Sequence, residues 1–410
     1  MTPDLSIYIF AIQLAGFAVG SIAALTFFLQ RHLSRVYSMS SCLLLAFLLS
    51  QLFELSKAVF PDLPFEWRQA VHMVSYASAV FVGPVFLFQV WLLTRQGDAL
   101  RRTAVLRHLV LPAFAVVATM TFLLVPVELR QAIDVTGLFE ERPDYLILHV
   151  MVLLALEPVV YLQWLVYAAL VFLAQRRHAA QLKHVFASTE KYELFWVIGI
   201  AGVLALYALG CLLSFVNRTF GIGLLVHPVL DSATVLLFVV LLTARGLRQA
   251  PGLHAKQRAA TLSADTDQTV AKYSRSALAS EHAKRIARKL HYAMQTETLY
   301  RDPNLSLTKL SQHIGSSSNY VSQTLNEHIN QSFFDFVNWW RIEEAKSTVL
   351  NADVSIRDTV YAVGFNSRSA FYTAFKKHTG QTPSKFRSQA DLSSCEVTSS
   401  TRPLGRIAST

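Results

Sequence analysis

Cysteine, charged residues and enzyme motifs are all scarce in this sequence, and each scarcity excludes a class of protein. Cysteine accounts for 3 of the 410 residues, which is too few for a fold held together by disulfides. Charged residues make up 16% of the chain, whereas a soluble globular protein has about 25%. The sequence has no HExxH zinc motif, P-loop, glycine-rich dinucleotide fingerprint or nucleophile elbow. We therefore expect no enzyme: no catalytic residues, no metal and no cofactor.

Apolar residues, by contrast, make up 53% of the chain. Most of the chain cannot be disordered, because disordered segments have low hydrophobicity. Seven apolar runs are near the roughly 20 residues that a helix needs to cross a bilayer. Six or eight spans are the alternatives, because charged residues interrupt the second and seventh runs. The predicted spans are Ser6–Leu29, Ser38–Phe60, Ala70–Leu93, His108–Val127, Tyr145–Leu173, Leu194–Val216 and Leu224–Ala244.

Lys and Arg are distributed unevenly among the segments outside these spans. The segments on one side, counted only as far as Arg258 after the seventh span, hold fourteen of them, and those on the opposite side hold four. Because positively charged loops stay in the cytoplasm, we expect a multi-pass protein of the cytoplasmic (inner) membrane. Its N-terminus would lie outside and its C-terminus in the cytoplasm. The longest outside loop, Glu128–Asp144, has 17 residues, too few for an extracellular domain.

The composition changes after the seventh span. Residues 246–410 carry 21 Lys and Arg against 13 Asp and Glu, a net charge of +8, whereas residues 1–245 have a net charge of +2. We interpret residues 1–245 as the transmembrane domain and the polar residues 246–280 as a cytoplasmic linker. Residues 281–388 have a helical pattern and form the predicted compact cytoplasmic domain. The Ser/Thr-rich residues 389–410 are predicted to be a disordered tail.

The same helical pattern occurs twice within residues 281–388. A short helix ends at a glycine, Gly315 or Gly364, which supplies the positive φ of a sharp turn, and a second helix follows. Ser355 and Asp358 have the spacing of a capping box. We therefore predict an all-α protein: a seven-helix transmembrane bundle, then a cytoplasmic domain with two helix-turn-helix units joined by a long helix. The predicted helices of that domain are Leu307–Ile314, Ser318–His328, Phe333–Leu350, Ile356–Val363 and Ser367–His378.

Residues 355–387 resemble the signature of AraC/XylS-type transcription regulators, and the similarity extends over about residues 280–388. Ser311 and Val360 depart from it, because the family usually has alanine there, and Asn330 stands in place of a glycine. Asparagine tolerates the left-handed conformation, so we expect the turn at Asn330 to be preserved. The matching positions are Leu305, Ser306, Leu307, Leu310, Ile314, Gly315, Ser317, Leu325, Phe333, Arg341, Ile342, Ala345, Ile356, Val363, Gly364, Phe365, Phe371, Phe375, Lys376, Lys377, Gly380, Pro383 and Arg387.

The resemblance implies that the second helix of each pair enters the DNA major groove. Asn and Gln can bond adenine there and Arg can bond guanine, whereas four basic residues would contact phosphate. The alternative is that these side chains are only solvated. We assign Phe365, Phe371 and Phe375 to the core. The predicted base-contacting residues are Asn319, Ser322, Gln323, Arg368, Ser369, Tyr372 and Thr373, and the predicted phosphate-contacting residues are Lys376, Lys377, Lys385 and Arg387.

Seven ionisable residues fall inside the predicted spans, where charge is costly and commonly functional. Helical spacing allows Glu54 to pair with Lys57, and His227 with Asp231. We hypothesise a polar pocket that opens outward between spans two, three, five and seven and takes a small ligand or ion. The alternative is a set of structural pairs that lock the bundle. The ligand-sensing candidates are Glu54, Lys57, His72, His149, Glu157, His227 and Asp231.

These features favour a membrane-integral one-component transcription regulator whose bundle senses a small ligand or a membrane signal. The expected partners are promoter DNA, membrane lipid, RNA polymerase, a small ligand and a second copy of the chain. Activation is favoured over repression by the resemblance alone. Two alternatives remain: an integral membrane enzyme or transporter fused to a regulator, and a bundle that acts only as an anchor.

Overall fold

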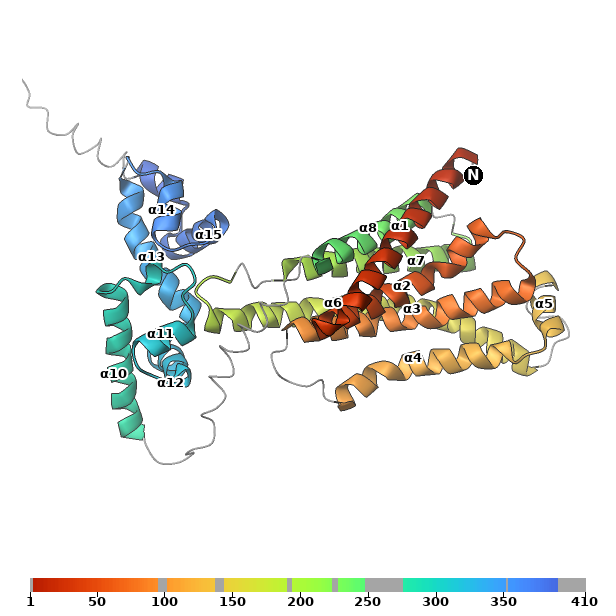
Figure 1. Ribbon diagram of the computed structural model, residues 1–410, viewed down its shortest axis with the longest axis horizontal. Coiled ribbons are helices and arrows are strands. Elements are labelled where there is room, and N and C mark those ends of the chain that lie inside the picture. Colours follow the sequence, from red (N-terminus) through yellow and green to blue (C-terminus); the bar gives the residue numbers. More distant parts are fainter. Residues whose placement is uncertain are drawn as a thin grey trace, which may run out of the picture. The chain divides into compact units, whose positions relative to one another are not determined.

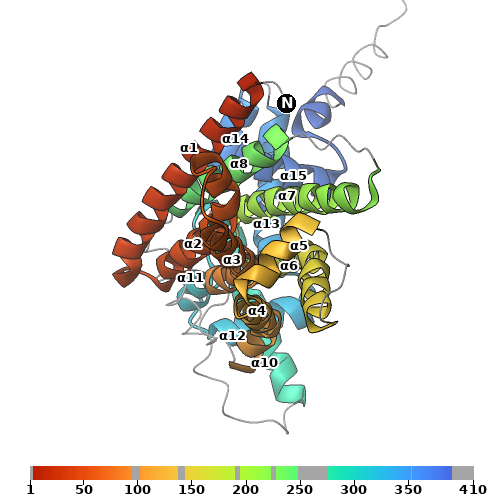
Figure 2. The ribbon, with the colours of Figure 1, turned by 90° about the vertical axis from the view of Figure 1, so that its right-hand side faces the viewer.

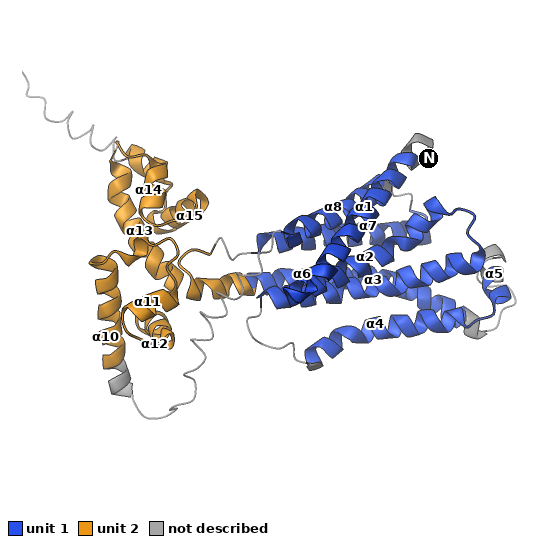
Figure 3. Cartoon of the chain, viewed as in Figure 1, with its two compact units in different colours: residues 1–176, 194–258 blue, residues 177–193, 259–410 orange. Residues whose placement is uncertain are grey.

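The computed structural model describes residues 3–94, 102–136, 144–189, 194–222, 228–247, 276–351 and 353–389. These residues are mainly helical and form no β-strand. The chain divides into two compact units, shown in Figure 3. Unit 1 comprises residues 1–176 and 194–258, and unit 2 comprises residues 177–193 and 259–410. Unit 1 therefore differs from residues 1–245, the predicted transmembrane domain, in two places: residues 177–193 belong to unit 2, and residues 246–258 are grouped with unit 1.

Unit 1 contains seven helices that are long and apolar enough to cross a membrane, judged by length and composition. They agree in number and order with the seven predicted spans. A shorter helix, α5 (Val127–Thr136), follows the fourth of them. The seven helices are α1 (Pro3–Leu29), α2 (Arg35–Val59), α3 (Phe65–Thr94), α4 (Arg102–Leu123), α6 (Asp144–Val185), α7 (Phe195–Phe220) and α8 (Pro228–Leu247) (Figure 1).

Helix packing within unit 1 requires small residues at close contacts. In the end-on view of Figure 2, α3 lies between α2 and α4, and it contacts both. On α3, a Cβ added at Gly83 would lie 2.5 Å from the ring of Tyr167 on α6, so no larger residue fits there. Tyr167, Phe86 and Phe238 belong to the buried core of this unit.

The outer surface of unit 1 is also apolar. Ile22 is 68% exposed, Val110 67% and Leu124 82%, and similar residues recur along all seven long helices. Soluble monomers rarely expose contiguous apolar patches of more than a few hundred Å². A surface of this kind is stable when another apolar phase covers it.

Unit 2 contains the helical pattern that was predicted for residues 281–388. Helix α13 has the bounds that were predicted for it, and α11, α14 and α15 begin and end within one residue of their predicted bounds. The predicted helix Ser318–His328 is divided into α12 and a π-helical turn, Thr324–His328. Most of the predicted linker and almost all of the predicted tail lie outside the described residues. The helices are α10 (Ser276–Gln295), α11 (Leu307–His313), α12 (Ser318–Gln323), α13 (Phe333–Leu350), α14 (Ile356–Ala362) and α15 (Arg368–Thr379).

Serine residues determine where these helices begin. The side chain at each N-cap accepts a hydrogen bond from a backbone N–H in the first turn, which satisfies a donor that the helix leaves free. One bond of the predicted capping box is confirmed, because Ser355 Oγ accepts from Asp358 N at 3.0 Å. Ser355 Oγ also donates to the Asp358 carboxylate at 2.6 Å. The capping serines of α11 to α15 are Ser306, Ser317, Ser332, Ser355 and Ser367.

Helix α13 contributes to two separate hydrophobic cores. Its first half supplies Phe336 to a core shared with α10, α11 and α12, and its second half supplies Ile342 to a core shared with α14 and α15. The turns between paired helices have positive φ, +63° at Gly315 and +92° at Gly364. Asn330 has φ +57°, so the expected left-handed turn is confirmed.

Candidate DNA-binding surface and bundle pocket

Helices α12 and α15 carry most of the predicted DNA-contacting residues. The assignment of Phe365, Phe371 and Phe375 to the core is confirmed, because each is at most 3% exposed. The predicted contact residues all have solvent-accessible side chains. Those classed as exposed are Gln323, Arg368, Ser369, Thr373, Lys376, Lys377 and Lys385, and those half-buried are Asn319, Ser322, Tyr372 and Arg387.

On α12 and the turn after it, polar side chains already interact with one another. Gln323 Nε2 donates to Glu327 Oε2 at 2.9 Å, and Asn326 Nδ2 donates to Ser322 Oγ at 3.4 Å. Sequence reasoning missed Tyr320, whose side chain is 50% exposed on this helix. A carboxylate such as Glu327 accepts from the amino group of cytosine and repels phosphate, so this helix end is suited to bases.

On α15, the predicted residues differ in how far they are already engaged. Within the described part of the chain, the side chains of Arg368 and Lys376 make no hydrogen bond or ion pair. Lys377 Nζ lies 2.6 Å from Asp335 Oδ1 at the start of α13. Partial burial raises the pKa of Asp335, but hydrogen bonds from Lys377 and Ser332 outweigh it and hold the pKa below its usual value.

Arg387 also has an internal role. Its Nε donates to the carbonyl of Val349 at 2.6 Å and its Nη2 donates to that of Val354 at 2.8 Å. These bonds connect the end of the domain to the last turn of α13 and to the segment that follows it. Contact between Arg387 and phosphate stays a prediction, and it would use the donors that these two bonds leave over.

An unexpected part of unit 2 comes from the segment between α6 and α7. Phe186, Ala187 and Ser188 are all at most 8% exposed. Phe186 pairs with Ser306 in an isolated antiparallel bridge, and Ala187 N donates to the carbonyl of Leu305 at 3.3 Å. We call residues 186–189 the inserted segment. Sequence reasoning treated them as an ordinary loop.

Arg341 on α13 connects the inserted segment to the rest of unit 2. It is fully buried, and a buried charge is costly unless its hydrogen bonds are satisfied. Its Nη1 donates to Ser188 Oγ at 3.1 Å, while Nε and Nη2 donate to the carbonyls of Tyr300 and Asp302 at 2.7 and 2.9 Å. Asn338 Nδ2 adds a bond to the Ala187 carbonyl at 3.4 Å. The inserted segment therefore helps satisfy a buried cation in this domain.

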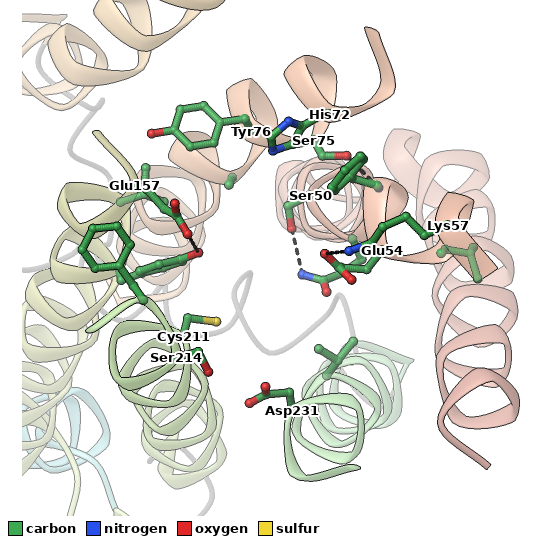
Figure 4. A pocket seen from close by; sticks show the side chains of 18 of the residues that line it. Ser50, Glu54, Lys57, His72, Ser75, Tyr76, Glu157, Cys211, Ser214 and Asp231 are labelled. Atoms are coloured by element: carbon green, nitrogen blue, oxygen red, sulfur yellow. Dashed lines mark hydrogen bonds and ion pairs between the residues drawn. The ribbon is translucent and has the colours of Figure 1, made fainter. Parts of the chain in front are cut away.

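Unit 1 contains a cavity of about 780 Å³. Residues of all seven long helices line it, with α4 contributing Phe122, so all four spans predicted to form a pocket contribute. His149 lies elsewhere and is 2.9 Å from the hydroxyl of Thr121, and His227 lies outside the described residues. The predicted residues that line the cavity are Glu54, Lys57, His72, Glu157 and Asp231 (Figure 4).

The charges of the cavity are paired except at Asp231. Lys57 Nζ lies 2.7 Å from Glu54 Oε1, which confirms the predicted pair. Arg218 Nη2 lies 2.5 Å from Glu157 Oε1. Among the described residues, the carboxylate of Asp231 has no hydrogen-bond or ion-pair partner, and Figure 4 shows it directed toward the open space.

Aromatic rings form much of the cavity wall, and sequence reasoning missed most of them. Trp164 and Tyr207 stack with centroids 5.7 Å apart, and Tyr161 meets Trp164 edge to face at 6.3 Å. The hydroxyl of Tyr161 also donates to Glu157 at 3.1 Å. The i, i+4 spacing of Glu157 and Tyr161 was a usable signal, whereas tertiary packing alone brings Tyr207 to the site. Within the described residues, no group of His, Cys, Asp and Glu is arranged to hold a metal ion.

Comparisons with known proteins bear on unit 2. Residues 310–389 match the family described as a helix-turn-helix domain. An uncharacterized HTH-type transcriptional regulator of Staphylococcus aureus (strain COL) is 36% identical over 89 residues, which are 22% of this chain and 12% of that protein. One from Pseudoalteromonas carrageenovora is 33% identical over 88 residues, 22% of this chain and 51% of that protein. No solved structure matches the chain.

The matched part of this chain thus spans about an eighth of the length of the first of these relatives and about half of the length of the second. The matched region includes α12, α13, α14 and α15 and ends where the described part of unit 2 ends. The C-terminal part of this chain is therefore a helix-turn-helix DNA-binding domain similar to those of HTH-type transcriptional regulators.

Proposed function

We propose that this protein is a membrane-integral, one-component transcription regulator controlled by its own transmembrane bundle. Seven long apolar helices with an apolar outer surface support insertion into the inner membrane. The bias of Lys and Arg toward one set of loops supports a cytoplasmic DNA-binding domain and an outside N-terminus. Membrane lipid, promoter DNA and RNA polymerase are the partners this function requires, and a homodimer would raise the local concentration of DNA-reading helices.

The DNA-binding part of the proposal uses both helix pairs. Helices α12 and α15 each follow a turn at a positive-φ glycine, the arrangement of a recognition helix in a helix-turn-helix. In this proposal α12 and α15 enter successive major grooves. Arg368 reads a base and Lys376 contacts phosphate, because both side chains are exposed and without a partner among the described residues.

The single observation that carries control by the bundle is the inserted segment. Residues 186–194 join α6 to α7 in the chain, and both helices belong to the set proposed to cross the membrane. Ala187 belongs to the hydrophobic core of the DNA-binding unit, and Ser188 helps satisfy the buried Arg341. A ligand can shift the bundle between states only if it binds one of them better. The inserted segment then carries that shift into the core beside α11 and α13.

A bundle that acted only as an anchor has no need of this connection. A chimera in which an unrelated anchor replaces residues 1–245 does not test that alternative cleanly. It also removes Ala187 and Ser188 from the core of the DNA-binding unit. A valid anchor replacement keeps residues 177–193 and supplies them from a flexible tether.

The sharper experiment perturbs the inserted segment alone. Ala187 is 1% exposed, so Ala187→Leu overpacks its site at a cost of about 1–3 kcal/mol. His184→Leu is the matched control, because His184 is exposed near the end of α6. Both variants are expressed at equal level with a reporter for a promoter identified by mapping bound DNA.

We expect Ala187→Leu to change basal reporter output by about fivefold or more, since about 1 kcal/mol shifts a two-state equilibrium by that factor. His184→Leu is expected to leave output within about twofold of wild type, as surface substitutions do. Promoter binding by both full-length variants in nanodiscs shows that the domain is folded. Wild-type output from a folded Ala187→Leu protein contradicts control by the bundle.

A further inference from the structure

We propose that the bundle cavity is a binding site for an organic monocation with an aromatic or apolar body. This inference rests on the proposed function, because it names the class of ligand that the sensing bundle takes. The juxtaposition that carries it is one carboxylate, Asp231, that has no partner among the described residues, in a cavity of about 780 Å³ whose other charges are already paired.

The first feature that selects the ligand is the charge of the cavity lining. Lys57 offsets Glu54 and Arg218 offsets Glu157, so within the described part of the lining Asp231 is the source of one net negative charge. Removing a carboxylate from water is costly unless a charge partner or hydrogen bonds compensate it. An anionic ligand adds a second uncompensated charge, and a neutral ligand covers Asp231 without pairing it. A ligand with one positive charge removes the imbalance.

The second feature is the position of the Asp231 carboxylate. A Cβ added at Gly210 on α7 would lie 3.0 Å from Asp231 Oδ1, so the carboxylate reaches close to the backbone of the neighbouring helix. Cys211 and Ser214, which follow Gly210 on α7, line the cavity opposite Asp231 in Figure 4. Ser214 offers a hydroxyl and Cys211 only a thiol, so neither brings a positive charge to this end of the cavity.

The third feature is the aromatic part of the cavity wall. Tyr76, Tyr161, Trp164 and Tyr207 all line the cavity, and the last three are in ring contact. The face of an aromatic ring attracts a cation, by about 2 kcal/mol or more where water is excluded. The same rings remove apolar surface of a ligand from water, so an aromatic amine gains on both counts.

The fourth feature is the volume of the cavity, which favours an organic cation over a metal ion. Pockets for drug-sized molecules have volumes of about 300–1,000 Å³, and this cavity lies within that range. A hard metal cation needs about six or more oxygen ligands at 2.0–2.6 Å. Asp231 is the one acidic side chain of this lining whose charge is not already offset.

The test uses three probes with one ring system and three charges: tryptamine (cation), tryptophol (neutral) and indole-3-acetate (anion). Binding to the full-length protein is measured by calorimetry in nanodiscs of zwitterionic phosphatidylcholine, and empty nanodiscs correct for partition into lipid. The variants are Asp231→Asn, which removes the charge at nearly constant shape, and Asp231→Glu, which keeps it. Asp62→Asn is the matched control, because Asp62 is exposed between α2 and α3 and does not line the cavity.

We expect tryptamine to bind wild type at least tenfold more tightly than tryptophol, and indole-3-acetate to bind more weakly than either. The preference should disappear in Asp231→Asn and persist in Asp231→Glu and Asp62→Asn. An Asp231→Asn protein that melts like wild type and keeps the preference overturns the proposal. Binding of tryptamine no tighter than tryptophol, including no binding of either, also overturns it.

Reporter measurements separate failure of this inference from failure of the proposed function. A response of reporter output to Ala187→Leu with no charge preference in the cavity refutes the ligand class and leaves control by the bundle standing. Cation binding that depends on Asp231, with output unaffected by Ala187→Leu, supports the ligand class and refutes control by the bundle.

Discussion

Two turn glycines in equivalent positions provide a matched test of how unit 2 is built. Gly315 joins α11 to α12 and Gly364 joins α14 to α15, and both have positive φ. A Cβ at Gly315 meets open space, whereas one at Gly364 would lie 2.6 Å from the carbonyl oxygen of Tyr300 and 2.7 Å from that of Arg301. The same substitution therefore tests backbone conformation alone at one site, and conformation plus close packing at the other.

The expected magnitudes follow from these surroundings. Placing a residue with a Cβ in the left-handed region costs about 1–2 kcal/mol, so Gly315→Ala should lose about that much. Gly364→Ala adds a clash with two backbone carbonyls, which have no rotamer to escape into. We expect a loss of about 3 kcal/mol or more, a large part of the about 5–15 kcal/mol that stabilises a domain.

The assay is hydrogen exchange of the full-length protein in nanodiscs, followed by mass spectrometry. Peptides from α14 and α15 should lose protection in Gly364→Ala far more than peptides from α11 and α12 do in Gly315→Ala. Equal losses at the two sites would refute the packing argument, because conformation alone would then explain both. A loss confined to Gly315→Ala would contradict the structure at both turns.

Two further predictions concern DNA binding and pH. Arg368→Ala should relax discrimination at one base position by about 1–3 kcal/mol, while Lys376→Ala should weaken binding to all sequences and reduce the slope of log affinity against log salt concentration by about 1. Titration of promoter and scrambled DNA at several salt concentrations checks both, and equal effects of the two variants would contradict the assigned roles. The pKa of Asp335 is lowered in the folded state, so its contribution to stability is present above the unfolded pKa of about 3.9 and is lost as pH falls through the folded value. Melting between about pH 5 and pH 2 should therefore destabilise wild type more than Asp335→Asn, and parallel curves would remove this role of the ion pair with Lys377.

Local signals made much of the fold predictable. Serine caps and turn glycines fixed helix limits in unit 2 because they act within a few residues, and Phe333–Leu350 was predicted with its observed bounds. Apolar run length was equally informative in unit 1. The pair of Glu54 and Lys57 was predictable because both residues lie on one helix, three positions apart.

Contacts between distant segments were not predictable from the residues alone. Arg218 looked like a loop residue, yet it pairs with Glu157, 61 positions earlier in the chain. The inserted segment gave no signal, because alanine and serine are ordinary loop residues. Only the fold brings Ala187 and Ser188 to Arg341, more than 150 positions later.

In the proposed function, the transmembrane bundle controls the DNA-binding domain through the inserted segment. The most direct measurement is genome-wide promoter occupancy and transcript output, taken together in cells that express wild type, Ala187→Leu or His184→Leu at equal level. We expect His184→Leu to match wild type, and Ala187→Leu to occupy the same kind of sequence with altered occupancy or output. Identical occupancy and output in all three strains would contradict the claim and leave the bundle as an anchor.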